Sequence, residues 1–301
     1  METRPIGSLH ASVVGLGCNN FGRRVDEDGT RRVIDASIDA GVTFLDTADI
    51  YGDTESETFL GRILAGRRDR VVLATKFGME VAPDKVGGAP DYVHRSVRDS
   101  LARLQTDHID LYQLHQPDAS VPIADTLAAL NDLVRDGLVR EIGCSNFTAP
   151  QQREAADAVA EGAARFVSVQ NELSLLERAD QTDGLVGAAD LGLAYIPYFP
   201  LASGVLTGKY RRGQAPPEGT RLAFYKEAVS DDEFDKVDAY VRFAADRGHT
   251  LLELAIGWLL SHDAVASVIT GATRPDQIES NALASSWRLS AEEMAAVAVL
   301  D

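Results

Sequence analysis

The sequence predicts a single (β/α)8 barrel over residues 1–301, and three observations favour that fold class. Short β-rich apolar runs alternate with longer amphipathic runs along the whole chain. Near-continuous apolar strands separated by helices are typical of a parallel sheet. Eight such units in about 300 residues match the usual size of a closed barrel that forms one domain.

The strands are expected at Ser12–Leu16, Val42–Leu45, Val71–Thr75, Ile109–Leu114, Val139–Gly143, Phe166–Val169, Leu193–Pro197 and Val265–Ile269. The helices between them are expected at Thr30–Ala40, Glu55–Leu64, Tyr92–Leu104, Ile123–Asp136, Pro150–Ala160, Arg178–Leu191 and Leu251–Ser261. Glycines stand where a left-handed residue usually ends a helix, at Gly41, Gly66, Gly137, Gly192 and Gly248.

The longest irregular stretch is Ser203–Val229, which is rich in Gly and Pro. It predicts a long functional loop over the barrel mouth. An open Rossmann sheet is the alternative architecture, because "GLGCNN" at Gly15–Asn20 begins like a G-x-G-x-x-G loop. The match is weak, since Asn20 replaces the third glycine and no helix follows promptly.

Composition and charge exclude several classes of partner. The net charge of −17 argues against nucleic acid or anionic lipid as the main partner, since both bind a basic face. An anionic ligand would therefore need a local basic pocket. No apolar run reaches the roughly 18 residues of a membrane span, and no signal peptide is expected. The two cysteines, Cys18 and Cys144, suit a reducing compartment, so the expected location is cytoplasmic.

Polar residues follow the ends of successive predicted strands. Asp46 and Tyr51 follow the second strand, Lys76 the third and His115 the fourth. Taken singly, each has an ordinary structural explanation, such as a helix cap, a solvated charge or packing. Because residues after barrel strands face one mouth, the four are expected to converge there.

Their chemistry explains the combination. The phenol of Tyr51 has an ordinary pKa near 10, so it is a poor acid at neutral pH. An ammonium about 4 Å away favours the phenolate by up to roughly 4 kcal/mol at an effective dielectric of 20. Asp46 would keep Lys76 charged, Lys76 would lower the pKa of Tyr51, and Tyr51 would protonate a developing alkoxide. His115 would donate a second hydrogen bond to that oxygen. Hydride addition to a carbonyl produces such an oxyanion.

The motifs "FLDTADIYG", "VVLATKFG", "DLYQLHQPD", "IGCSNF", "VQNELSLLER", "YFPLASGVLTGKY" and "VITGATRPDQIESN" occur in this order along the chain. Together they resemble the aldo-keto reductase superfamily, within it the bacterial branch related to potassium-channel β subunits. The resemblance implies a catalytic tetrad of Asp46, Tyr51, Lys76 and His115. It also implies the cofactor NADPH (NADP+), a small-molecule carbonyl substrate, no metal, and a monomer or homo-oligomer.

The resemblance further implies roles for the other strand ends. The nicotinamide carboxamide would be held by Ser145, Asn146 and Gln170, with Tyr198 stacked on the ring. The residues expected to lie along the pyrophosphate are Leu201, Ser203, Gly204, Leu206 and Lys209. The adenosine end would be held by Gly271, Ala272, Thr273, Arg274, Gln277 and Asn281. Candidate substrate contacts are Phe21, Ile50, Phe77 and Trp287, with Phe224 and Tyr225 as further wall residues, and ordinary packing is the alternative for each.

The segment Gly271–Asn281 also has the chemistry needed to hold the adenosine end of the cofactor. A helix is expected to begin in "GATRPDQIESN", and a helix N-terminus offers free N–H groups to an anion. Arg274 can pair with a ribose 2′-phosphate in fork geometry, which favours NADPH over NADH.

Two other functions remain open from the residues. An aldolase-type lyase would use Lys76 as a Schiff base, which needs a neutral amine that a close Asp46 disfavours. A redox sensor or accessory subunit would bind NADPH with little turnover. The expected function is NADPH-dependent, reversible reduction of an aldehyde or ketone.

Overall fold

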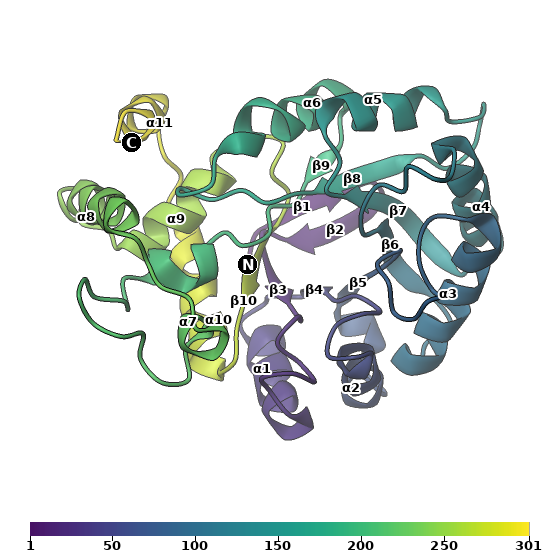
Figure 1. The fold of residues 1–301 in the computed structure, drawn as a ribbon, viewed down its shortest axis with the longest axis horizontal. Helices are drawn as coiled ribbons and strands as arrows, with labels where there is room; N and C mark the ends of the chain where they lie inside the picture. Colours follow the sequence, from purple (N-terminus) through teal and green to yellow (C-terminus); the bar gives the residue numbers. More distant parts are fainter. Residues whose placement is uncertain (301) are drawn as a thin grey trace.

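Eight parallel strands form one curved sheet with helices along its outside (Figure 1). The computed structural model describes residues 1–300, and Asp301, the last residue of the predicted domain, lies outside the described residues. The strand order is β10-β3-β4-β5-β6-β7-β8-β9. A parallel bridge between Tyr195 of β9 and Val265, just before β10, joins the two edges. The predicted (β/α)8 barrel is confirmed.

The barrel strands are β3 (Val14–Gly17), β4 (Phe44–Asp46), β5 (Val72–Phe77), β6 (Ile109–Leu114), β7 (Val139–Ser145), β8 (Phe166–Gln170), β9 (Ala194–Tyr195) and β10 (Val268–Gly271). The helices are α1 (Glu27–Asp39), α2 (Glu55–Ile63), α3 (Pro90–Leu104), α4 (Ile123–Arg135), α5 (Ala149–Asp157), α6 (Gly184–Leu191), α7 (Arg221–Tyr225), α8 (Asp231–Ala245), α9 (Leu251–Leu260), α10 (Pro275–Leu283) and α11 (Ala291–Ala298). All the glycines expected at helix ends have positive φ, between 65° and 78°.

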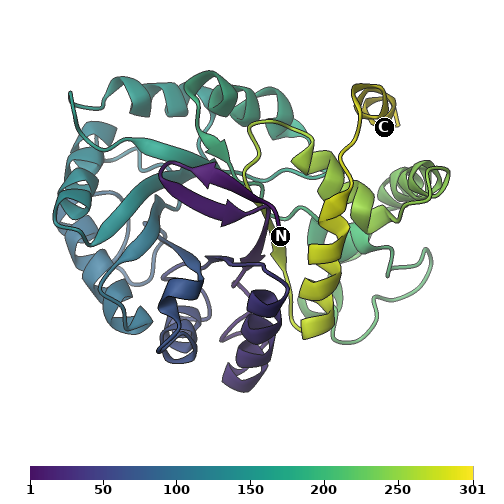
Figure 2. The ribbon, with the colours of Figure 1, turned by 180° about the vertical axis from the view of Figure 1, so that it is seen from behind.

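A hairpin before the barrel and the helices α7, α8 and α11 were not expected from the sequence. An antiparallel hairpin, β1 (Thr3–Ile6) and β2 (Leu9–Ser12), precedes the barrel. Figure 2 shows it lying across the end of the barrel that faces the viewer there. The helices α8 and α11 each begin with a reciprocal capping box that marks a helix start, formed by Ser230 with Glu233 and by Ser290 with Glu293. The predicted helix at Arg178–Leu191 is shorter, because a 3-10 turn (η2, Ala179–Thr182) precedes α6.

The hairpin closes the bottom of the barrel with apolar side chains. Its Ile6 and Leu9 join a buried cluster whose barrel members include Phe44, Ala74, Leu111, Ile196 and Ile269. Arg4 also donates hydrogen bonds to the carbonyls of Val265 and Leu260 (2.6 and 3.0 Å). With this end filled, polar side chains inside the barrel can reach a ligand only from the opposite mouth.

Candidate active site

A cavity of about 840 Å³ opens at the carboxyl ends of the strands. Its volume lies in the range of ordinary ligand pockets, roughly 300–1,000 Å³. The cavity is lined by Asp46, Tyr51 and His115 and by nearly all the predicted cofactor contacts, namely Ser145, Asn146, Gln170, Tyr198, Leu201, Ser203, Gly204, Lys209, Gly271, Ala272, Thr273, Arg274, Gln277 and Asn281. The segment Ser203–Val229 contributes several of its walls, as expected for a loop over the mouth.

Lys76 and Asp46 form an ion pair inside the barrel. The Lys76 Nζ lies 2.5 Å from Asp46 Oδ2, and neither side chain is more than 3% exposed. The ammonium also donates to the carbonyl of Thr47 (2.9 Å). Burial lowers the pKa of Lys76, but Asp46 and Tyr51 together raise it by more, so the net pKa is raised. The lysine is therefore charged at neutral pH.

Asp46 is held from its other side by two amides. The Nε2 groups of Gln170 and Gln113 donate to Asp46 Oδ1, at 2.9 and 3.2 Å. Gln113 was not predicted as a site residue. Its signal in the sequence is a polar side chain in an apolar strand two positions before His115, which places both on one face of β6.

Tyr51 lies between the ammonium and the cavity. Its hydroxyl is 3.4 Å from Lys76 Nζ, and its ring meets the His115 ring edge-on, with centroids 5.8 Å apart. Lys76 does lower the pKa of Tyr51, as expected, but burial raises it more, so the net pKa lies above the ordinary value. The expected net decrease in this pKa is thus corrected. The phenol carries its proton at neutral pH, as a proton donor must.

His115 also lines the cavity. Burial, followed by the neighbouring Lys76, lowers its pKa to about 3, so the imidazole is neutral at pH 7. Its carbonyl accepts a hydrogen bond from Asn146 Nδ2 (2.9 Å). A neutral ring can still donate one N–H to an oxygen atom.

The residues expected around the nicotinamide are linked to one another. Ser145 Oγ donates to the carbonyl of Gln170 (2.7 Å), and Tyr198 Oη donates to Asn146 Oδ1 (2.8 Å). Asn146 has a left-handed backbone (φ 61°), which is uncommon for a residue other than glycine. These bonds hold the Tyr198 ring on the cavity wall.

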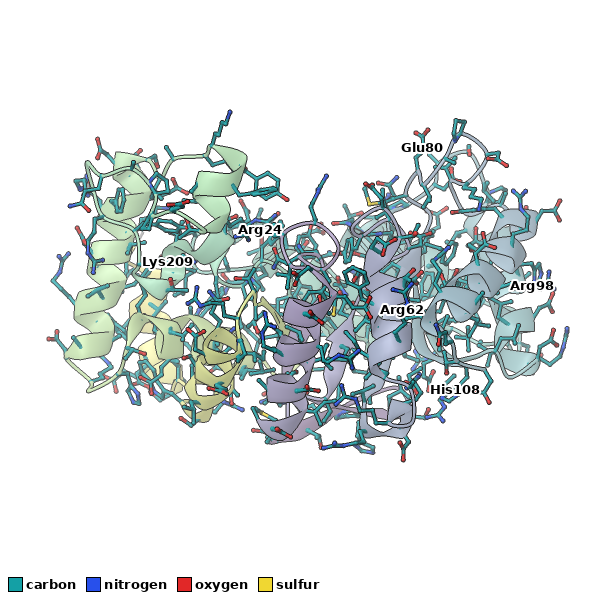
Figure 3. All side chains as sticks on the ribbon, turned by 90° about the horizontal axis from the view of Figure 1, so that it is seen from below. Arg24, Arg62, Glu80, Arg98, His108 and Lys209 are labelled. Atoms are coloured by element: carbon teal, nitrogen blue, oxygen red, sulfur yellow. The ribbon has the colours of Figure 1, made fainter. Side chains whose placement is uncertain are left out.

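Four basic residues line the cavity: Arg24, Lys209, Arg221 and Arg274. Figure 3 shows Arg24 and Lys209 in the same part of the molecule, away from Arg98 and His108. Lys209 Nζ lies so close to Gly204 that an added Cβ there would be 2.4 Å from it. Arg24 bridges the β3–α1 loop to the segment over the mouth, since it donates to Asn20 Oδ1 and to the carbonyl of Gly219 (3.1 and 2.9 Å).

Arg24 and Arg221 were missed from the sequence because neither follows a barrel strand directly. The only available signal was their charge in a strongly acidic chain. Together the basic side chains supply the local positive pocket that the net charge of −17 demands for an anion.

Several predicted contacts do not line the cavity. Leu206 is fully buried in the core. Phe77 follows Lys76 in β5, so it points to the opposite face, where it stacks on Tyr112 with centroids 4.7 Å apart. Trp287 stacks on His249 at 3.9 Å instead.

Phe21 and Ile50 are also absent from the cavity wall, as are the further candidates Phe224 and Tyr225. Phe21 is fully buried, and its carbonyl packs against Gly52, so it supports the loop that carries Tyr51. Phe224 is 51% exposed. The apolar wall residues that were not predicted from the sequence are Met79, Phe199, Pro200, Pro217, Leu252 and Ile269.

The donors in the cavity fit a phosphorylated dinucleotide. Amide and hydroxyl groups line the cavity beside the tetrad. The basic side chains line it near the N-terminus of α10. A helix N-terminus and basic side chains are the usual partners of phosphate. Among residues 1–300, no group of three or more His, Cys, Asp or Glu side chains could hold a metal ion. Within the same residues, no helix has the length and apolar character needed to cross a membrane.

The fold and this arrangement define an oxidoreductase of the aldo/keto reductase family, to which the chain belongs. The family model matches residues 13–301. A probable voltage-gated potassium channel subunit beta of Oryza sativa subsp. japonica is 35% identical over 276 residues, covering 87% of this chain and 83% of that protein. The aldo-keto reductase YhdN of Bacillus subtilis is 32% identical over 298 residues, covering 95% of this chain and 88% of that protein.

Two solved structures of similar proteins have the same fold. The aldo-keto reductase AKR11C1 from Bacillus halodurans, in its holo form, superposes with a TM-score of 0.83 and 32% identity, covering 100% of this chain and 96% of that one. The glycerol dehydrogenase AKR11B4 from Gluconobacter oxydans gives a TM-score of 0.85 at 28% identity, covering 99% and 94%.

Proposed function

We propose that this protein reduces an aldehyde or ketone to an alcohol with NADPH, reversibly. The observation that carries the proposal is the position of Lys76, whose ammonium contacts Asp46 on one side and Tyr51 on the other. Family membership supports the reaction class, and the basic cavity supports a phosphorylated nicotinamide cofactor. A small carbonyl compound is the proposed substrate, and a cytoplasmic location suits the two free thiols.

The bound cofactor would supply the hydride, from nicotinamide C4. Ser145, Asn146 and Gln170 would hold the carboxamide, and Tyr198 would stack on the ring. The substrate oxygen would lie at the Tyr51 hydroxyl, with the neutral His115 as second donor. As negative charge develops on that oxygen, Tyr51 gives up its proton, and the Lys76 ammonium stabilises the phenolate that remains. Asp46 keeps the ammonium charged through this step.

The lyase alternative is disfavoured by the same contact. A Schiff base needs a neutral amine, whereas Asp46 raises the pKa of Lys76.

The test is NADPH oxidation with a panel of small aldehydes and ketones, comparing the wild type with Tyr51→Phe. Turnover is expected to fall by a factor of about 10²–10⁴, since a general acid contributes that much, while NADPH binding stays near normal. Tyr225→Phe is the matched control, because Tyr225 lies outside the cavity wall. Undiminished turnover in Tyr51→Phe would refute the acid assignment. Tight NADPH binding without turnover in the wild type would instead favour the sensor function.

A second variant tests the cofactor. Arg274→Ala is expected to weaken NADPH binding more than NADH binding, because only NADPH carries a 2′-phosphate for the guanidinium to bind. Binding is measured by calorimetry with each cofactor. Equal weakening of both would exclude the role in 2′-phosphate binding.

A further inference from the structure

Among the four basic residues that line the cavity, Arg274 is the one that pairs with a carboxylate within residues 1–300. Its Nε donates to Asp276 Oδ1 (3.0 Å) and its Nη2 to Asp276 Oδ2 (2.9 Å). Both carboxylate oxygens are therefore bound to one edge of the guanidinium. That planar edge is the same one that would bind a phosphate in bidentate fashion.

The local backbone favours this pair. Arg274 is the N-cap of α10 in an extended conformation (φ −144°, ψ 153°), and Pro275 begins the helix. Asp276 stands in the first turn, where the helix dipole stabilises a carboxylate. The two side chains thus meet across a single fixed proline, and both line the cavity.

We infer that Asp276 sets the balance between NADPH and NADH by holding Arg274. This inference rests on the proposed function. A cofactor with a 2′-phosphate must take the guanidinium from Asp276 and bring two negative charges beside its carboxylate. A cofactor with a 2′-hydroxyl does neither of these things. In the NAD sites of other folds, an acidic side chain commonly accepts a hydrogen bond from the ribose 2′-hydroxyl.

The other cations make the effect selective. Lys209 and Arg24 have no carboxylate partner within residues 1–300, so they remain available to the pyrophosphate that both cofactors carry. The pKa of Lys209 is lowered by burial and then by Arg24 and Arg274, which places the three cations near one another. Glu218 also lines the cavity, but it makes no ion pair with Arg274. Asp276 is therefore the acid whose removal frees a phosphate ligand.

The test is calorimetric binding of NADPH and NADH to Asp276→Asn. NADPH is expected to bind about fivefold more tightly than to the wild type, the size of one exposed ion pair, and NADH within about twofold of it. Asp276→Glu is expected to keep the wild-type ratio. Glu279→Gln removes the same charge from α10 outside the cavity wall and should leave both affinities unchanged. In an Arg274→Ala background, Asp276→Asn is expected to lose most of its effect on NADPH.

Each result has a defined meaning. An unchanged NADPH-to-NADH ratio in Asp276→Asn, or an equal gain for both cofactors, would overturn the inference while leaving the proposed function in place. A wild type that binds neither cofactor would overturn the proposed function itself. Thermal unfolding of each variant, followed by circular dichroism, verifies that the comparison is made between folded proteins.

Discussion

At the scale of single residues, the site depends on a charge that the barrel interior would otherwise exclude. Lys76 is fully buried, and burial alone would favour its neutral form. Asp46 offsets this by direct contact, and two glutamine amides hold Asp46 in turn. A buried pair of this kind adds little net stability, but losing one partner leaves an uncompensated charge.

Lys76→Met should therefore lower the free energy of unfolding by about 3–5 kcal/mol and abolish turnover. The double variant Asp46→Asn/Lys76→Met is expected to recover most of that stability, since its buried amide needs no counter-ion, while turnover stays absent. Urea denaturation and the reductase assay measure the two effects separately. A double variant no more stable than Lys76→Met would show that packing, rather than unpaired charge, sets the cost.

At the scale of elements, the turn between β4 and α2 positions the tyrosine. Gly52, Asp53 and Thr54 all have positive φ (60°, 54° and 76°), which is unusual for the β-branched threonine. A Cβ on Gly52 would lie 2.4 Å from the carbonyl oxygen of Phe21. The turn is thus packed against the loop after β3, and this contact fixes where Tyr51 enters the cavity.

Gly52→Ala should consequently lower the free energy of unfolding by about 3 kcal/mol or more and reduce kcat. Gly66→Ala is the matched control, because Gly66 also has positive φ (76°) but nothing lies within 4 Å of its added Cβ. Its expected cost is only about 1 kcal/mol, with kcat unchanged. Equal effects of the two variants on unfolding would mean that backbone strain alone matters.

At the scale of the whole molecule, closure of the barrel joins distant parts of the chain. β3 near the N-terminus pairs with β10 near the C-terminus, and the β1–β2 hairpin covers the bottom. Neither half of the chain completes the barrel alone, so we propose that the chain folds as one domain. The free energy of unfolding of that domain then depends on the protonation of its buried acidic groups. Asp49 is one of them: it is 2% exposed, and its Oδ1 has no hydrogen-bond partner within residues 1–300.

Burial, followed by the neighbouring Glu57, raises the pKa of Asp49 to about 7. A carboxyl whose pKa is higher in the folded state binds its proton more tightly there. Its contribution to stability is complete below about pH 4, the unfolded pKa, and is lost as the pH rises through 7.

Asp49→Asn should remove this pH dependence, which amounts to at most about 4 kcal/mol for a shift of roughly three pKa units. Urea denaturation between pH 4 and pH 8 measures it. Asp53→Asn, an exposed change on the same turn, should leave the wild-type slope intact. A wild-type slope retained in Asp49→Asn would assign the titration to another group.

The sequence by itself determined the barrel, its strand positions within a few residues and the four tetrad candidates. The physical reason is that these signals are local. Apolar runs mark the strands, glycines mark the helix ends, and the barrel topology brings the polar residues at the strand ends to one mouth. The hairpin and the helices α7, α8 and α11 were not predicted, although α8 and α11 both begin with a capping box.

Only the tertiary structure decided which side chains share the cavity. Phe77, Trp287 and Leu206 do not line the cavity, because they pack in the core or against other rings. Gln113, Arg24 and Arg221 join the site through contacts between segments distant in sequence. The net pKa of Tyr51 depends in the same way on how completely the fold removes it from water, which no spacing of residues along a chain specifies.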